Sequence, residues 1–210
     1  MSPHVPKAYL EARRNEILEA AVKCFKEKGF HNTTMQDIYK ETNLSAGAVY
    51  NYFKSKEDIV SEAVEASKER NLEVISAAAS GEPEGALSHV GQIYFSCAKN
   101  VDFAAEASVD LALYSEAGRN RRIRDALRLN QDAVMTKLAE LVKLDQSAGI
   151  FDGSLDATAV ARVLFSILVG SEIHIALDPH SDLDSYARVF ESIVKGTFSK
   201  SGKRNRRNSK

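Results

Sequence analysis

Apolar residues recur at helical spacing along most of the chain, and this pattern predicts an all-α protein. The stretch 9–28 shows it clearly, with Gly29 directly after it as a helix-ending residue. No stretch alternates apolar and polar residues as a half-buried strand does. About nine helices are predicted, over residues 9–28, 34–42, 46–52, 56–79, 86–100, 103–116, 121–146, 157–177 and 184–198.

Polar residues mark where these helices begin. Thr33 with Gln36 has the spacing of a capping box for the second helix. Ser45 is an N-cap candidate for the third helix, and Asn43 before it tolerates the left-handed backbone of a tight turn. The later helices have their own N-cap candidates: Ser55 with Asp58, Asp102, Asn120, Asp156, and Asp182 or Asp184.

Composition narrows the class of protein. The 210 residues are 44% apolar and 27% charged, as in a soluble globular protein of one or two domains. No run of 18 apolar residues occurs and the N-terminus lacks a signal-peptide core, so we expect a cytoplasmic protein without a membrane-spanning helix. Cys24 and Cys97 lack metal-binding spacing and lie in apolar patterns, which predicts inert core thiols rather than redox sensors, and no metal or cofactor.

Charge is distributed unevenly along the chain. Residues 1–56 carry a net charge of +3 and residues 199–210 carry +6, so the residues between them carry −10 and the whole chain −1. Basic ends around an acidic body point to a polyanion as the partner of the ends. The segment 199–210 has no helical periodicity and is predicted to be a disordered basic tail.

The segment 33–56 contains two short helices joined by a tight turn at Asn43–Leu44. In such a unit the first helix braces against phosphates while the second enters the major groove of DNA. The second helix begins with small residues, which let its backbone approach the base edges, and Ala48 could contact a thymine methyl group. Groups that donate to phosphate oxygens follow at Tyr50, Asn51, Tyr52 and Lys54, and Lys56 lies in the first turn of the next helix.

A specific set of residues extends this pattern over residues 10–60. It comprises Ile17, Ala20, Ala21, Phe25, Gly29, Phe30, Thr34, Ile38, Leu44, Ser45, Ala46, Gly47, Tyr50, Asn51, Tyr52, Phe53, Lys56, Glu57 and Ile59. This set resembles the DNA-binding domain of TetR-family bacterial transcriptional regulators. The rest of the chain matches that family only in the order and length of its helices.

The resemblance implies three parts and a function. Residues 1–56 would form a helix-turn-helix DNA-binding domain, 57–198 a helical ligand-binding and dimerisation domain, and 199–210 the tail. The protein would be a dimeric regulator and not an enzyme, most simply a repressor that a small apolar or amphipathic ligand releases from a palindromic operator. DNA contacts are implied at Thr33, Thr34, Ser45, Ala46, Gly47, Ala48, Tyr50, Asn51, Tyr52, Lys54 and Lys56.

Within that pattern the resemblance assigns separate roles. Tyr50 and Lys56 fall where the family clamps phosphates, whereas Ile38 and Phe53 fit the core of the small domain. Tyr39 departs from the pattern because the family often has a small residue there, and the sequence leaves open whether its side chain packs or reaches DNA.

The resemblance also implies a ligand cavity among the helices of the body. Its candidate lining residues are Tyr94, Cys97, Phe103, Ala107, Asp110, Leu111, Tyr114, Met135, Leu138, Phe165, Ser171 and His174. Asp110 stands out because its neighbours on the helix are apolar, and an unpaired buried carboxylate is costly. Its carboxylate either faces solvent or pairs with an arginine. Five arginines cluster at the start of the helix 121–146: Arg119, Arg121, Arg122, Arg124 and Arg128. This arginine cluster is a solvated charged face, a site for an anionic ligand, or the partner of Glu106, Asp110 or Glu116.

The last two helices have more apolar surface than one neighbour could cover. The helix 157–177 is apolar on two sides, and the helix 184–198 has one long apolar stripe. In the resembling family these helices pair with their copies in a second subunit. The implied interface residues are Val160, Leu164, Ile167, Leu168, Tyr186, Val189, Phe190 and Ile193.

Two other classes of function compete with this interpretation. An enzyme would need a catalytic constellation, and the sequence has no GxSxG, P-loop or HExxH motif. Glu172 and His174 are two residues apart on a helix and do not share a face. The stronger alternative is a DNA-binding or nucleoid-associated protein that needs no ligand. A cavity of about 300 Å³ or more in the body would favour the ligand-regulated class.

Overall fold

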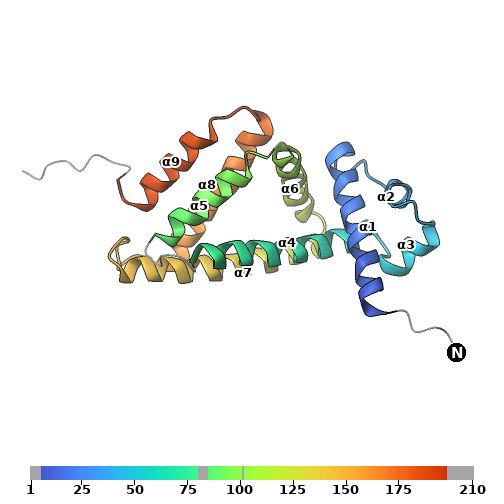
Figure 1. Ribbon diagram of the computed structural model, residues 1–210, viewed down its shortest axis with the longest axis horizontal. Helices are drawn as coiled ribbons and strands as arrows, with labels where there is room; N and C mark the ends of the chain where they lie inside the picture. Colours follow the sequence, from blue (N-terminus) through green and yellow to red (C-terminus); the bar gives the residue numbers. More distant parts are fainter. Residues whose placement is uncertain (1–5, 80–84, 101, 198–210) are drawn as a thin grey trace, which may run out of the picture.

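The computed structural model describes residues 6–79, 85–100 and 102–197, and the predicted basic tail lies outside them. Within these ranges the chain is all helical, with nine α-helices and no strand, as the sequence predicts (Figure 1). The helices are α1 (Lys7–Lys28), α2 (Met35–Glu41), α3 (Ala46–Tyr52), α4 (Lys56–Ala79), α5 (Ala86–Cys97), α6 (Phe103–Ala117), α7 (Arg121–Ser147), α8 (Ala157–Leu177) and α9 (Leu183–Val194).

The helices form a small N-terminal unit and a larger body. α1, α2 and α3 lie together at one end of the molecule, and α4 leads away from them toward the other end (Figure 1). α4 packs against α7, α8 packs against both α6 and α7, and α9 packs against α5. α6 also contacts α1, so the body touches the N-terminal unit directly as well as through α4.

The N-terminal unit has its own apolar core, which extends into the body. Ile38 of α2, Val49 of α3 and Phe53 after α3 are at most 1% exposed and pack with residues of α1 and α4. Leu113 of α6 and Ile123 of α7 belong to the same buried cluster. Because this core is shared, a displacement of α4 or α6 changes the surface on which the three short helices rest.

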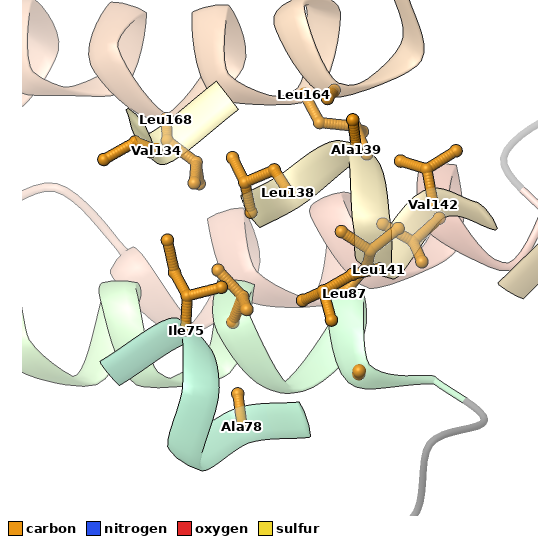
Figure 2. Close-up of a cluster of buried hydrophobic side chains, with 14 of the residues drawn as sticks. Ile75, Ala78, Leu87, Val134, Leu138, Ala139, Leu141, Val142, Leu164 and Leu168 are labelled. Atoms are coloured by element: carbon orange, nitrogen blue, oxygen red, sulfur yellow. The ribbon is translucent and has the colours of Figure 1, made fainter. Parts of the chain in front are cut away.

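The body is held by a second core in which α7 is central. Leu138 and Leu141 of α7 lie between Ile75 of α4, Leu87 of α5 and Leu164 of α8 (Figure 2). Phe190 of α9 joins this core, where its ring lies 6.1 Å from that of Phe95 on α5. Gly91 of α5 allows that contact, because a Cβ there would lie 2.3 Å from the Phe190 ring.

Three helix ends differ from the predicted ones, and local hydrogen bonding and backbone conformation account for the differences. The α2 capping box is formed by Thr34 and Asp37, one residue later than the predicted pair. α5 ends at Cys97 rather than 100, because the backbone N–H groups of Lys99 and Asn100 bond three residues back. α9 ends at Val194 rather than 198, with Gly196 nearby in a left-handed conformation at φ 66°.

α8 is long and apolar enough to cross a membrane by length and composition alone, although no unbroken apolar run of 18 residues exists. It packs against α6 and α7 in the helical body, where Leu164 and Leu168 are buried. Much of the rest of the helix is not buried within this chain. The exposed apolar part of α8 is available for contact with another protein chain.

Candidate nucleic-acid interface and cavity

The turn between α2 and α3 has the geometry that the sequence predicts. Asn43 adopts a left-handed conformation at φ 52°, and the Ser45 hydroxyl caps α3 by accepting from the Ala48 N–H at 3.2 Å. Val49 and Phe53 anchor α3 in the core, since both are fully buried. The opposite side of α3 therefore has a fixed orientation toward solvent.

Most of the predicted DNA-contacting residues are exposed or half-buried at the surface of the α2–α3 segment. Tyr50 is 41% exposed, and Asn51 beside it is also exposed. Lys54 is exposed, with its ammonium 2.5 Å from the Tyr50 carbonyl oxygen. Of the other predicted DNA contacts in this segment, Thr34, Ser45 and Gly47 are exposed, whereas Ala46, Ala48 and Tyr52 are half-buried.

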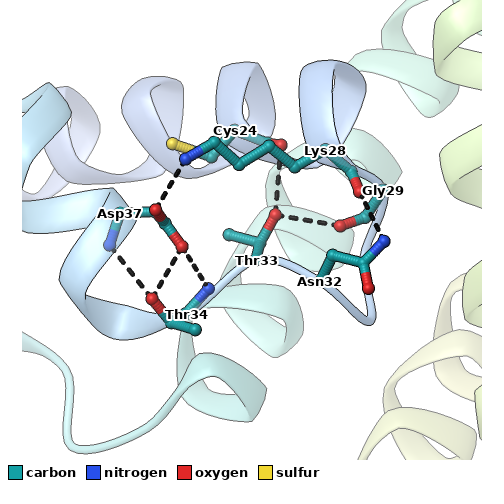
Figure 3. Close-up of polar contacts among 7 residues, drawn as sticks. All are labelled: Cys24, Lys28, Gly29, Asn32, Thr33, Thr34 and Asp37. Atoms are coloured by element: carbon teal, nitrogen blue, oxygen red, sulfur yellow. Dashed lines mark hydrogen bonds and ion pairs between the residues drawn. The ribbon is translucent and has the colours of Figure 1, made fainter.

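The two threonines before α2 have different environments, shown in Figure 3. Thr33 is 1% exposed, and its hydroxyl donates to the carbonyl oxygens of Cys24 and Gly29. Thr34 is exposed, and its hydroxyl and backbone N–H both donate to Asp37. The Lys28 ammonium and these Thr34 bonds hold the pKa of Asp37 well below its usual range. Thr33 is thus a structural link, and Thr34 has the surface position expected of a DNA contact.

Lys56 is engaged inside the N-terminal unit. Its ammonium donates to the carbonyl oxygens of Phe30 at 2.8 Å and Thr33 at 3.1 Å, and it lies 4.2 Å from the centroid of the Phe30 ring. A lysine ammonium has three donors, so one N–H remains for a phosphate oxygen. Lys56 therefore joins the start of α4 to the α1–α2 turn, in addition to any contact with DNA. Tyr39 is half-buried and packs on the N-terminal core.

Ion pairs connect the N-terminal unit to the body. Lys26 of α1 pairs with Glu106 of α6 at 2.7 Å, and Arg122 at the start of α7 pairs with Asp58 in the first turn of α4. Arg14 of α1 makes two hydrogen bonds to Glu62 of α4. These pairs lie where α1, α4, α6 and α7 meet, and they join the N-terminal unit to the body.

The body contains a cavity of about 940 Å³ that is partly open to solvent. Side chains from α4, α5, α6, α7 and α8 form its walls, and three residues of α1 reach it from the N-terminal unit. Seven of the predicted ligand-binding residues line it: Tyr94, Cys97, Phe103, Asp110, Tyr114, Leu138 and Phe165. Cys97 is exposed there, which corrects its prediction as a core thiol, whereas Cys24 is buried as predicted.

The other five predicted ligand-binding residues do not line the cavity. Ala107 and Leu111 lie on another face of α6, and Ala107 is buried in packing. Met135 is buried on α7 beside the lining residues Val134 and Leu138. The buried Ser171 hydroxyl donates to the Leu168 carbonyl oxygen at 2.6 Å, and His174 is exposed on α8. Sequence spacing identified the correct helices, but it did not distinguish neighbouring faces of each helix.

Glu172 is a carboxyl that lines the cavity but is absent from the predicted ligand-binding residues. It lines the cavity from α8 and accepts a hydrogen bond of 3.3 Å from the Tyr94 hydroxyl, which also donates to the Leu168 carbonyl oxygen at 2.9 Å. A carboxylate on an otherwise apolar helix was the signal that singled out Asp110, and the same signal is present at Glu172. Asp110 lines the cavity with its side chain exposed to solvent, which is the first of its two predicted alternatives, and the described residues provide no arginine partner for it.

Both cavity carboxyls have raised pKa values. Burial, followed by the negative charge of Glu106, raises the pKa of Asp110 to about 6. Burial, followed by the negative charge of Asp110, raises the pKa of Glu172 to about 7, while the Tyr94 hydrogen bond acts in the opposite direction. Asp110 is exposed to water within the cavity whereas Glu172 is half-buried, so burial opposes ionisation more strongly at Glu172.

Comparison of this chain with proteins of known sequence and fold identifies the class of protein to which it belongs. Residues 17–63 match the model for bacterial regulatory proteins of the tetR family. The HTH-type transcriptional regulator BetI of Agrobacterium fabrum is 30% identical over 156 residues, which are 71% of this chain and 75% of the relative. The chain belongs to the TetR family. It is a DNA-binding transcriptional regulator, a class of proteins that are not enzymes.

Solved regulators share the fold of this TetR-family protein across most of their length. A regulator from Saccharomonospora viridis, solved in complex with choline, superposes with a TM-score of 0.76 at 22% identity and covers 88% of this chain and 96% of its own. FadR of Bacillus subtilis, solved in complex with stearoyl-CoA, has a TM-score of 0.74 at 18% identity, with 87% and 98% covered. At these identities the likeness establishes the fold alone.

The predicted dimer residues of this regulator fall into two groups. Leu164, Leu168 and Phe190 are at most 6% exposed and belong to the core of the body, so they are not available to a second subunit. Val189 is 48% exposed, and the other four are half-buried: Val160, Ile167, Tyr186 and Ile193. Two α8 residues that the prediction left out are more exposed, Val163 at 61% and Leu177 at 80%.

The arginine cluster of the regulator does not line the cavity. Arg122 pairs with Asp58, Arg121 with Asp125, and Arg124 donates to the Ala117 carbonyl oxygen. All five arginines are exposed, as the solvated-face alternative expects. The side-chain contacts described for Arg121, Arg122 and Arg124 do not involve Glu106, Asp110 or Glu116.

The raised pKa of Glu172 predicts a pH-dependent stability. The folded protein binds the proton of the Glu172 carboxyl more tightly than the unfolded chain does. The protonated carboxyl therefore makes its full contribution to folding stability below about pH 4, and this contribution is lost as the pH rises through about 7. Glu172→Gln should therefore stabilise the ligand-free regulator by about 1–2 kcal/mol near pH 8 and by much less near pH 4. Thermal unfolding of both proteins across this range measures the difference, and a difference independent of pH would contradict the expectation.

Proposed function

We propose that the protein is a homodimeric cytoplasmic repressor that binds a palindromic operator and leaves it when a small apolar or amphipathic molecule fills the cavity. The observation that carries the DNA-binding part is the outward side of α3, where Tyr50, Asn51 and Lys54 are exposed on a helix anchored by Val49 and Phe53. Two such helices would enter successive major grooves about 34–36 Å apart, or a multiple of that spacing.

The uncovered side of α8 and α9 supports a two-fold dimer. Val163, Ile167 and Leu177 recur at helical spacing on α8, and two of them are strongly exposed. Val189 of α9 adds to this apolar surface. A second copy of the same helices would cover it, which also explains why a helix as apolar as α8 is only partly buried in one chain.

The cavity supports regulation by a ligand over the ligand-independent alternative. Its volume of about 940 Å³ exceeds the 300 Å³ or so that a small-molecule site needs. Regulators with this fold have been solved with choline and with stearoyl-CoA, so the fold accommodates unlike ligands. A DNA-binding protein that used no ligand would have no need of so large a space in its body.

α4 is the element that would couple the cavity to DNA. It starts at Lys56 beside the α1–α2 turn, and its residues from Val60 to Ile75 line the cavity. A ligand that fits only one position of α4 would select that position and change the separation of the two α3 helices. A tenfold loss of DNA affinity requires only about 1.4 kcal/mol of coupling.

Selection from random duplex DNA tests the proposal. We expect a palindromic consensus, and we expect Lys54→Ala to weaken binding about tenfold at every sequence and to reduce the salt dependence by about one phosphate contact. Asn51→Ala should instead change the preferred bases. Lys143→Ala, an exposed lysine of α7 on the body, is the matched control and should bind as the wild type does.

Anisotropy titrations at several salt concentrations measure these affinities. An asymmetric or absent consensus, or a Lys54→Ala variant with wild-type affinity and salt dependence, would count against α3 as the reading helix.

A further inference from the structure

The lining of the cavity includes two carboxyls and two tyrosines, which we call its polar end. Asp110 and Tyr114 line the cavity from α6, Glu172 lines it from α8, and the Tyr94 hydroxyl of α5 donates to Glu172. Aliphatic side chains such as Val64, Ile75 and Val134 make up much of the remaining wall, with polar residues such as Asn130 and Gln131 among them. A ligand that fits this space has a polar head and an apolar body.

The charged groups of the cavity leave the two carboxyls without a cationic partner. Two lysines line the cavity, but both are paired elsewhere among the described residues. Lys26 pairs with Glu106, and Lys99 pairs with Asp184, which lies outside the cavity. Arg70 of α4 also lines the cavity, but it is not among the groups that shift the pKa of either carboxyl. Among the described residues, the contact that offsets this negative charge is the Tyr94 hydrogen bond to Glu172, while Asp110 is exposed to water within the cavity.

Aromatic rings border the same end of the cavity. The Tyr94 ring meets the Phe103 ring edge-on, with centroids 5.8 Å apart, and Tyr94 donates its hydroxyl hydrogen to the Leu168 carbonyl and Glu172 oxygens. Tyr114 lines the cavity from α6, one helical turn after Asp110, and Phe165 lines it from α8. Ring faces attract cations, and this attraction is strongest where water is excluded.

We propose that the cavity binds an organic cation, an amine or quaternary ammonium with an apolar body, whose charged head lies between Asp110 and Glu172. The inference rests on the proposed function of the cavity as a regulatory site and names the class of its ligand. A cation supplies the missing counter-charge for both carboxylates and lies against the tyrosine rings. An anionic head would be repelled by the same carboxylates, and a neutral head would leave them uncompensated.

Three probes with the same ten-carbon chain separate these possibilities: decyltrimethylammonium, decanoate and decanol, each below its micellar concentration. Calorimetry on the full chain near pH 8 measures binding, and operator anisotropy in the presence of each probe measures release. We expect decyltrimethylammonium to bind at least about tenfold more tightly than decanol, and decanoate to bind least, because buried charge pairs carry large differences in affinity.

Substitution of the carboxyls tests the same assignment. Asp110→Asn with Glu172→Gln keeps the size of both side chains and should reduce the affinity for decyltrimethylammonium at least about tenfold while leaving that for decanol nearly unchanged. Glu140→Gln, which removes a carboxylate from the exposed surface of α7 outside the cavity, is the control and should bind all three probes as the wild type does.

The outcomes separate the ligand class from the regulatory role. Absence of decyltrimethylammonium binding, tighter binding of decanoate, or an unchanged affinity in the double variant would overturn the cation assignment, even if another probe releases DNA. Binding of decyltrimethylammonium with the expected dependence on both carboxyls, but without loss of operator affinity, would support the cation site and contradict ligand-controlled release.

Discussion

A variant with Val163→Asp and Val189→Asp is expected to be monomeric and to lose specific operator binding. Both valines are exposed on the side of α8 and α9 that we assign to the dimer interface, at 61% and 48%. Each substitution would bury an uncompensated carboxylate in that interface, which strongly disfavours association. Two linked reading heads bind a palindrome with an avidity about 10²–10⁴ above that of one head, so we expect a loss of at least about a hundredfold.

Light scattering at micromolar concentration and operator titration measure this result. Leu129→Asp with Leu144→Asp is the matched control, because these exposed leucines lie on α7 and the two carboxylates would remain in water. The control should stay dimeric and keep its DNA affinity. Wild-type protein that is monomeric, or a Val163 and Val189 variant that is dimeric, would remove the support for this interface.

Filling the cavity should abolish the ligand response without affecting DNA binding by the free protein. Val109 of α6 and Val169 of α8 both line the cavity, and replacing each with Trp projects a large side chain into the space beside Asp110 and Glu172. We expect the concentration of effector needed for release to rise by at least about tenfold, while operator affinity without ligand changes less than about twofold. Operator titrations with and without decyltrimethylammonium provide both measurements.

The choice of these two positions depends on the structure. Ala107 and Ser171 are among the lining residues that the sequence predicts, but both side chains are buried away from the cavity, where a larger residue would strain the core. Leu129→Trp, on the exposed surface of α7, is the control. A filled variant that can no longer bind DNA would indicate that occupancy of the cavity by itself drives release, contrary to the expected result.

The N-terminal unit could be predicted from the sequence in detail because its signals are local. Ser45 caps α3 and Asn43 takes the left-handed turn, as their side chains and backbone preferences indicate. The α2 cap was assigned one residue too early, because Thr33 and Thr34 are equally good caps by type. The tertiary structure decides between them, because the buried Thr33 hydroxyl donates to the carbonyl oxygens of Cys24 and Gly29, whereas Thr34 caps α2.

The sequence by itself determined the all-helical class, the position of nearly every helix and the membership in the family, since these depend on periodicity, caps and a specific motif. The tertiary structure decided which face of each helix meets which neighbour. Leu164 and Phe190 look like interface residues in a helical stripe but pack inside the chain, and only the packing of α5 against the body places Glu172 in the cavity within hydrogen-bonding distance of Tyr94. A helix with two apolar faces specifies that it has two partners, and only the packing of distant segments determines which face each partner covers.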